Sequence, residues 1–195
     1  MDSINVIVRA NDTISLNFKL FASKECLEYY PLAVGNYWEY HFTYEDKYYS
    51  LEVVSDTIIN GKRYFTIFQN FFNNPSLNDF IFERIDTALG VVYRYDQYFL
   101  VERPIDSLTA KIIQTFSSNM LYNMDRPCLS SCYNIEQKFV FGEVRKIKYF
   151  RHICGTDLPE YHLIKGIGFG GASVPRGFLP YKLKYARIKG VEYWE

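Results

Sequence analysis

The sequence predicts an all-β fold: an antiparallel meander whose strongly curved sheet closes toward a barrel or a sandwich, with little or no helix. The chain of 195 residues contains 18 Tyr and 16 Phe, side chains that suit a pleated sheet, whereas Ala, the best helix former, is rare. Short runs of alternating apolar and polar residues recur along the chain, separated by Gly, Asn, Asp or Pro. No helical segments alternate with these runs, as they would in an α/β fold.

The residues 1–29 are predicted to form an N-terminal β-hairpin extension, followed by an antiparallel β domain over residues 30–195. Two apolar runs, 4–10 and 13–20, flank Asn11-Asp12, residue types that tolerate the positive φ of a hairpin turn. Aligned apolar residues in the second run need a partner surface, so we expect this hairpin to join the same sheet. The alternative is that it is the tail of an upstream domain.

The stretch 30–42 predicts the strand around which the domain is organised. Pro31 marks an entry turn, and Trp38, Tyr40 and Phe42 then alternate with polar residues. Alternation with a period of two gives a strand with one apolar face. We therefore expect the indole of Trp38 to be buried and one continuous sheet to wrap around it.

Further strands are predicted by the same alternation, each ended by a turn residue. They cover residues 48–54, 62–69, 79–86, 91–96, 136–141, 144–154 and 160–165. Asn60-Gly61, between the first two, is the strongest short-range hairpin signal, because a type I′ turn demands positive φ at both central positions. The Asn and Pro residues of 71–78 predict a loop.

The segment 107–122 is compatible with helix and with strand. Apolar residues recur every four positions from Leu108 to Met120, and Asp106 is a suitable N-cap for a helix. Thr115-Phe116 suits a strand equally well.

The C-terminal region is predicted to contain a glycine-rich loop and a last hairpin. Residues 166–171 superficially resemble a dinucleotide-binding loop, but the Pro-Arg-Gly sequence at 175–177 forbids the helix that would receive the pyrophosphate. We expect these glycines instead to form a bend or bulge where strands pass closely. The runs 179–188 and 191–194 are predicted to pair across Lys189-Gly190.

Three of the four cysteines are candidates for a disulfide: Cys128, Cys132 and Cys154. Their spacing leaves the pairing open; a bond from Cys128 or Cys132 to Cys154 would attach the loop after Met120 to the sheet. Together with His152 these thiols also offer a tetrahedral zinc site, but the spacing departs from the usual zinc patterns, so we expect no metal. Unpaired buried thiols are the remaining alternative.

No group of residues predicts catalysis. His41, His152 and His162 lie in strand-like runs, outside any serine or cysteine nucleophile motif. Carboxylates cluster at strand ends, where Asp is a good turn former. We therefore predict no catalytic residue and no cofactor. A hydrolase in which His152 or His162 meets a carboxylate or thiol is the third alternative for function.

The composition also limits the partners. With 22 acidic and 22 basic residues the formal net charge is zero, so no summed positive field attracts nucleic acid or an anionic membrane. No run approaches the ~20 apolar residues of a transmembrane helix, and we predict no transmembrane segment.

The aromatic residues favour a binding function, although core packing accounts for most of them. A curved sheet can enclose an apolar small molecule or lipid, which requires a closed apolar cavity of ~300–1,000 Å³ lined by Tyr and Phe. The alternative is an adhesion or carbohydrate module, with coplanar aromatic rings exposed outside and a filled interior. Tyr48-Tyr49, Phe71-Phe72 and Tyr98-Phe99 supply surface for either function, and no ligand-binding residue is assigned.

Short motifs of turn and core residues also carry a resemblance. They are Tyr30–Tyr40, Asp56–Tyr64, Arg84–Asp86, Lys165–Gly168 and Ala186–Tyr193. On these motifs the chain resembles uncharacterised exported β-rich domains of Bacteroidetes-type bacteria, which open with a PL.VGN.W.Y strand and close with an EGIG turn and an A.INGV.Y hairpin. The resemblance implies a fold and an extracytoplasmic location, in the periplasm, on the cell surface or secreted, but no activity. The first thirty residues show no signal peptide, so this location depends on the resemblance alone.

Overall fold

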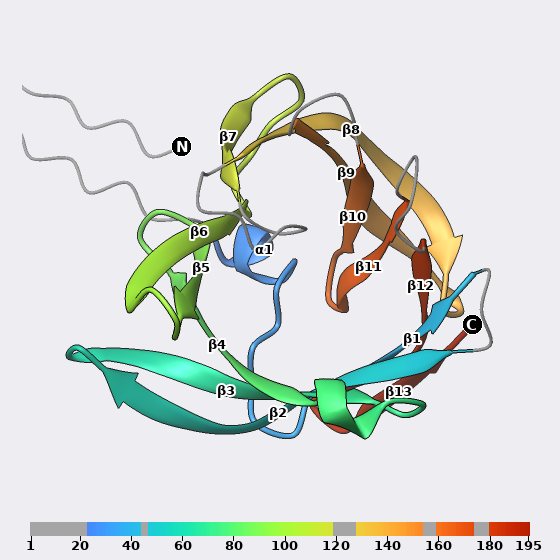
Figure 1. Cartoon of the computed structure of the whole chain (residues 1–195). Coiled ribbons are helices and arrows are strands. Elements are labelled where there is room, and N and C mark those ends of the chain that lie inside the picture. Colours follow the sequence, from blue (N-terminus) through green and yellow to red (C-terminus); the bar gives the residue numbers. More distant parts are fainter. Residues whose placement is uncertain (1–22, 44–46, 119–127, 154–158, 174–179) are drawn as a thin grey trace, which may run out of the picture.

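The computed structural model describes residues 23–43, 47–118, 128–153, 159–173 and 180–195. These residues form one antiparallel sheet of 13 strands. Figure 1, which views the sheet nearly end on, shows that it curls almost into a closed barrel. The predicted fold class is therefore confirmed. The predicted N-terminal hairpin of residues 4–20 lies outside the described residues.

The strands follow one another along the chain and around the barrel. Their bounds are β1 Tyr37–Phe42, β2 Tyr48–Ile59, β3 Lys62–Phe71, β4 Asp79–Asp86, β5 Val91–Asp96, β6 Val101–Ser107, β7 Thr115–Ser118, β8 Cys128–Val140, β9 Glu143–Ile153, β10 Glu160–Ile164, β11 Gly168–Ser173, β12 Tyr181–Ile188 and β13 Val191–Trp194. The sheet order is β6-β5-β4-β3-β2-β1-β12-β11-β10-β9-β8-β7, and β13 pairs with β12. The hydroxyl of Ser118 on β7 donates to the carbonyl of Ile105 on β6 at 2.6 Å, so the two ends of the sheet meet.

The predicted central strand is β1, and its apolar face points into the barrel. Trp38 is only 6% exposed, and its Nε1 donates to the carbonyl of Ile167 at 2.6 Å. The hydroxyl of Tyr40 donates to the carbonyl of Phe169 at 2.9 Å. Gly168, between these two acceptors, has a φ of +107°, and a Cβ there would lie 3.4 Å from the indole nitrogen. The indole is therefore buried as predicted, and the positive φ of the residue beside it favours glycine.

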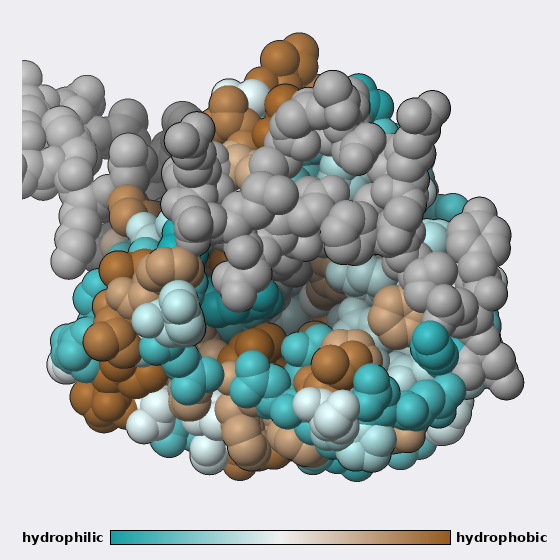
Figure 2. All heavy atoms as spheres, in the orientation of Figure 1, coloured by the Kyte–Doolittle hydropathy of each residue, from teal (hydrophilic) through white to brown (hydrophobic). Residues whose placement is uncertain are grey.

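The segment that precedes β1 lies inside the ring of strands and fills one end of it (Figure 1). It contains the short helix α1, Lys24–Leu27, and the buried Tyr29. The N–H of Gly166, in the β10–β11 turn, donates to the carbonyl of Glu28 at 2.9 Å. The N–H of Lys189, in the β12–β13 turn, donates to the side-chain oxygen of Asn36 at 2.8 Å. Figure 2 shows that the face seen in this orientation is hollowed in the middle.

The first hairpins form as predicted. β2 and β3 turn at Asn60 and Gly61, whose φ values of 50° and 74° are both positive, as a type I′ turn requires. β4 and β5 turn at residues 87–90, where Asp86 accepts hydrogen bonds from the N–H groups of Ala88 and Leu89. The loop of 72–78 contains the short 3₁₀ helix Pro75–Leu77.

In its described part, the ambiguous segment 107–122 contains the strand β7 and no helix, while residues 119–122 lie outside the described residues. Strand β6 was not predicted, because Pro104 interrupts its alternation and lacks an N–H. Pro104 lies opposite Tyr93, next to a bulge at Ile105 in β6 itself. The missing donor is tolerated there because the ladder is already irregular.

Two other predictions were wrong in their boundaries. β8 begins at Cys128 and not at residue 136, so Cys128 and Cys132 lie in a strand, not in a loop. The glycine-rich stretch is a loop only at residues 165–167, and Gly168–Ser173 is β11. A Cβ at Gly171 would collide with the carbonyl oxygen of Tyr181 on β12. The glycines therefore allow the close approach of strands that we expected, but within a strand.

The pairing between β11 and β12 is short. Only Gly171 with Lys182 and Ala172 with Tyr181 form residue pairs there, whereas β8 and β9 pair over almost their whole length. Among the ladders of the sheet, the one between β11 and β12 is therefore the shortest, while β6 and β7, the two ends of the sheet, form no ladder.

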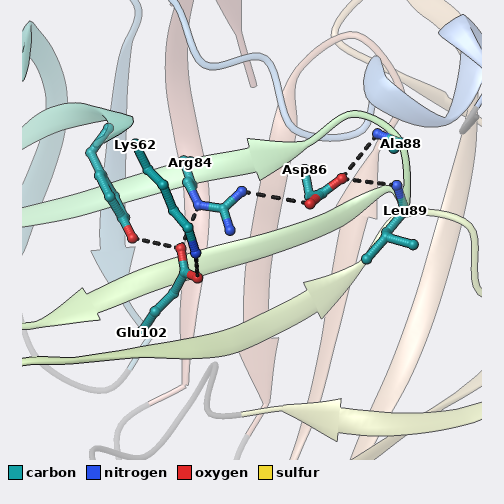
Figure 3. Close-up of polar contacts among 7 residues, drawn as sticks. Lys62, Arg84, Asp86, Ala88, Leu89 and Glu102 are labelled. Atoms are coloured by element: carbon teal, nitrogen blue, oxygen red, sulfur yellow. Dashed lines mark hydrogen bonds and ion pairs between the residues drawn. The ribbon is translucent and has the colours of Figure 1, made fainter. Parts of the chain in front are cut away.

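The outer face of β3 to β6 carries a cluster of polar contacts (Figure 3). Glu102 on β6 accepts hydrogen bonds from the hydroxyl of Tyr64 at 2.5 Å, from Lys62 Nζ at 2.7 Å and from Arg84 Nε. Arg84 also lies 3.8 Å from Asp86. Burial raises the pKa of Glu102, but the hydrogen bonds from Arg84, Lys62 and Tyr64 outweigh it and lower this pKa to about 2. The cluster thus connects β6 to β3 and β4 across β5.

We predict that Trp38→Phe lowers the free energy of unfolding by about 1–3 kcal/mol, because it leaves the buried carbonyl of Ile167 without its donor. Urea denaturation followed by circular dichroism measures this. The matched control is Trp194→Phe, an indole that is 66% exposed, which should change stability by no more than about 0.5 kcal/mol. Equal effects of the two substitutions would contradict the role of the Trp38 bond.

We predict that Glu102→Gln destabilises the fold at pH 7 by about 1–3 kcal/mol. The pKa of Glu102 is lowered from 4.5 to about 2 on folding, so its stabilising contribution is complete above pH 4.5 and is lost as the pH falls toward 2. The difference between wild type and variant should shrink over that range in urea denaturation. Glu52→Gln, which removes the exposed pair with Arg187, is the control and should have little effect.

Candidate functional site

A cavity lies at one end of β3 to β6, where side chains of the inner face and of the exposed rim, including Phe80 and Tyr98, line it. It has a volume of about 350 Å³ and is lined among others by Gln69, Ile81, Arg94, Arg103 and Ile105. A second space, beside Trp38 and Tyr30, measures only about 30 Å³, room for about one water molecule. The described residues thus fill the interior around the indole and leave a space beside these strands.

A buried ion pair lies beside this cavity. Glu83 on β4 is 1% exposed, and its Oε1 accepts hydrogen bonds from Nε and Nη2 of Arg94 on β5, at 2.9 and 2.6 Å. Its Oε2 accepts the hydroxyl of Tyr30 at 2.7 Å. The side chain of Arg94 remains 33% exposed, so its other N–H groups are accessible from the cavity. Burial lowers the pKa of Arg94, but the Glu83 carboxylate more than offsets it and the pKa is raised.

A second ion pair shapes the rim of the cavity. Arg103 Nε donates to Asp96 at 3.0 Å. Asp96 also accepts the N–H groups of Tyr98 and Phe99, both at 3.0 Å, which orders the β5–β6 loop. Burial raises the pKa of Asp96, but these N–H groups and Arg103 dominate and lower it. Each guanidinium of the cavity therefore has its own carboxylate, and neither contributes an uncompensated positive charge.

Aromatic rings line the inner face from β3 to β7. Successive ring centroids lie 4.9 to 5.9 Å apart along the series Phe71, Tyr49, Tyr181, Phe169, Tyr161, Phe150 and Phe116. We call this series the aromatic belt. Rings at these separations interact favourably in stacked and edge-on geometries. Burial raises the pKa of the Tyr49 and Tyr161 hydroxyls, so both stay protonated at neutral pH.

Buried polar groups also face the interior between β6 and β10. Oδ1 of Asp106 accepts the N–H of Ser107 at 2.7 Å, but its Oδ2 and the nearby hydroxyl of Tyr161 have no hydrogen-bond partner among the described residues. Burial raises the pKa of Asp106 to about 7, although the Ser107 N–H and Lys148 oppose the rise. Lys148 Nζ donates to the carbonyls of Leu108 and Ala110 at 2.6 and 3.1 Å.

The histidines do not form an accessible catalytic centre in the described structure. Nδ1 of His152 lies 2.8 Å from the hydroxyl of Ser130, but both residues are fully buried. Burial lowers the pKa of His152 to about 4, so its ring is neutral at pH 7. His162 lies on the outer face of β10 and stacks on Tyr149, with 5.5 Å between ring centroids. His41 likewise packs on Tyr48, with centroids 4.5 Å apart.

The cysteine predictions are resolved in part. Cys132 is a buried free thiol, so the predicted alternative in which Cys132 forms a disulfide is wrong. Burial raises the pKa of this thiol. Cys128 is disulfide-bonded, and Cys154 lies outside the described residues. In the part of the chain that the structure describes, no three His, Cys, Asp or Glu side chains are grouped to hold a metal ion. The described helices are also all too short to cross a membrane.

The sequence pattern identified no ligand-binding residue, although it held a usable signal. Ile81 and Ile85 pack against the core, and Glu83 lies between them on the same face of β4. Arg94 likewise follows the buried Val92 on β5. Opposite charges at inward positions of two adjacent predicted strands mark a buried pair, because isolated charges are almost never placed in a core.

Comparisons of the chain with protein-family models, with curated proteins and with solved structures find no match. The resemblance to exported β-rich domains therefore stays a prediction.

We predict that Asp106→Asn stabilises the protein above neutral pH. Folding raises the pKa of Asp106 from 3.8 to about 7, so its destabilising effect is absent below pH 3.8, grows as the pH rises from 3.8 to 7 and is complete above 7. The variant should match wild type near pH 4 and exceed it by about 1–3 kcal/mol at pH 8. Urea denaturation across this pH range is the measurement, and a variant less stable than wild type at pH 8 would argue against it.

Proposed function

We propose that this chain is a non-catalytic binding module that holds a small amphipathic molecule inside its barrel, against β3 to β6. The observation that carries the proposal is the pair Glu83–Arg94, a buried carboxylate bound to a guanidinium that still reaches the 350 Å³ cavity. Concave sites of this size that combine apolar walls with a few fixed polar groups are the usual binding sites for small molecules.

The ion pair supports a binding role because such a pair is a poor means of stabilising a fold. Removing two charges from water costs about as much as their attraction returns, and apolar residues of similar volume often stabilise as well or better. Tyr30, from the segment that fills the barrel, satisfies the second oxygen of Glu83. Arg94 is thereby held in one orientation with donors left over, which is the preorganisation that a binding site requires.

The lining indicates the class of ligand. Ile81 and Ile105 supply apolar surface, while Arg94, Arg103 and Gln69 supply donors. A wholly apolar ligand would leave these donors unpaired, so this cavity, although Phe80, Tyr95 and Tyr98 also line it, is not the closed apolar cavity that we expected for a lipid. Because each guanidinium is paired, a ligand with a hydrogen-bonding head group and an apolar body fits best. An extracytoplasmic location remains part of the proposal and is supported only by the resemblance.

The test is a fluorescence titration with dansyl-undecanoic acid, an amphipathic probe, after native mass spectrometry of the purified protein has shown whether a molecule is already bound. The double variant Glu83→Gln/Arg94→Met removes both charges at once and so leaves no unpaired buried charge. We expect it to bind the probe at least about tenfold more weakly, since tenfold corresponds to the loss of about one charged hydrogen bond.

The matched control is Arg84→Met/Glu102→Gln, which removes an ion pair between β4 and β6 on the opposite, outer face. It should bind the probe as wild type does. Absence of probe binding by wild type, or equal weakening by the two double variants, would refute the proposal.

A further inference from the structure

One side of β8 is left without a neighbouring strand over the second half of its length. β7 pairs only with residues 128–131 of β8, and a bulge between Cys132 and Asn134 follows. Residues 134–140 pair with β9 on one side, and no described residue pairs with them on the other. We call this unpaired side of residues 134–140 the open edge. It has no part in the cavity to which the proposed function is assigned.

The turn between β8 and β9 determines which backbone groups point to the open edge. It consists of residues 141–142, with φ values of 51° and 78°, and Val140 pairs with Glu143 across it. In a two-residue hairpin the residues that flank the turn exchange hydrogen bonds, and the direction of bonding alternates from there along the strand. The residues that direct their N–H and C=O groups away from β9 are therefore Ile135, Gln137 and Phe139.

The open edge can accept a further strand. A row of unpaired N–H and C=O groups is a template for pairing with another chain, unless a proline or a covering element blocks it. Residues 134–140 contain no proline. Gln137 and Lys138 are exposed, and the side chain of Phe139 is 69% exposed. The charges along the open edge decide which strand fits it.

The side chains of the open edge are complementary to themselves. When two copies of this edge are placed antiparallel with Gln137 opposite Gln137, Glu136 of each copy lies opposite Lys138 of the other. On the other face of the strand, Ile135 of each copy lies opposite Phe139 of the other. Opposite charges and apolar pairs at facing positions both stabilise an antiparallel sheet. In this register the N–H and C=O groups of the two Gln137 residues also face each other and bond.

Within one chain, the charges of the open edge are not paired with each other. No described carboxylate pairs with Lys138, which lies opposite the like charge of Arg145 on β9. Arg145 has its own partner, Glu143, at 3.0 Å. Glu136 accepts the hydroxyl of Tyr149 with its Oε1 at 2.7 Å, which leaves Oε2 for a further partner. A second copy supplies the opposite charge that both side chains lack.

We infer that the open edge of β8 binds the open edge of a second copy of this chain, antiparallel, with a two-fold axis at Gln137. The two sheets then continue into each other through an isologous contact. Registers centred on Ile135 or Phe139 also satisfy the backbone but place Lys138 opposite uncharged residues, so the charges select the register. Because the shared ladder is short, the dimer is weak and reversible.

The first test is sedimentation equilibrium over a concentration series up to about 1 mM. Wild type should dimerise and dissociate on dilution. Gln137→Pro removes an N–H that points away from β9, a position where a strand tolerates proline, and should weaken the dimer at least about tenfold. The matched control is Ile58→Pro. Ile58 is 66% exposed and lies next to the residue that flanks the β2–β3 turn, so its N–H also points outward, and the dimer should be unaffected.

The second test exchanges the charges. Glu136→Lys and Lys138→Glu each place like charges opposite each other across the axis, and each should weaken the dimer about tenfold. An equimolar mixture of the two variants restores opposite charges at every facing position and should dimerise about as strongly as wild type. Lys24→Glu, which changes an exposed lysine elsewhere, is the control and should have no effect.

Far-UV circular dichroism verifies that each variant is folded, and the charge variants keep the test decisive if the proline variant is not. Wild type that stays monomeric at about 1 mM, a folded Gln137→Pro variant that dimerises like wild type, or a mixture of Glu136→Lys and Lys138→Glu that dimerises no better than its separate components would each overturn the inference. None of these measurements depends on a ligand in the cavity, so the proposed function can fail without affecting them.

Discussion

β1 pairs with β12 from Tyr37 and Arg187 to Phe42 and Tyr181, and this contact joins the two halves of the chain into one sheet. Strands β2 to β6 follow from one side of it and β11 to β7 from the other. The indole of Trp38 reinforces the junction, because its bond to Ile167 reaches past β12 to the turn before β11. Closure of the barrel, and hence the existence of an interior, depends on this junction.

The segment before β1 contributes tyrosine side chains to the interior of the barrel. It enters the ring of strands, buries Tyr29 and brings the hydroxyl of Tyr30 to Glu83. Without this segment, the second carboxylate oxygen of Glu83 would lack its hydrogen-bond donor, the Tyr30 hydroxyl. The buried ion pair and the tyrosine bound to it therefore come from three separate parts of the chain, namely the segment before β1, β4 and β5.

Much of the fold could be predicted from local patterns, because strand alternation and turn chemistry are local properties. The burial of Trp38 and the turn at Asn60-Gly61 are examples. The strand predictions were wrong where contacts with neighbouring strands outweighed the local sequence pattern. Pro104 is accepted in β6 because it lies next to the bulge at Ile105, and Gly171 is in a strand because Tyr181 approaches it closely. The site was harder, since Tyr30 and Glu83 are 53 residues apart and no local pattern specifies that they meet.

The ladder between β11 and β12 is the shortest in the sheet, with two residue pairs. Tyr181, at this ladder, belongs to the aromatic belt inside, and the next residue, Lys182, lies on the outer face, where it pairs with Glu195. Successive side chains of a strand point to opposite faces, so one rotation of this strand about its axis displaces both. At this seam, two adjacent residues therefore couple the packing of the interior to the charges of the surface.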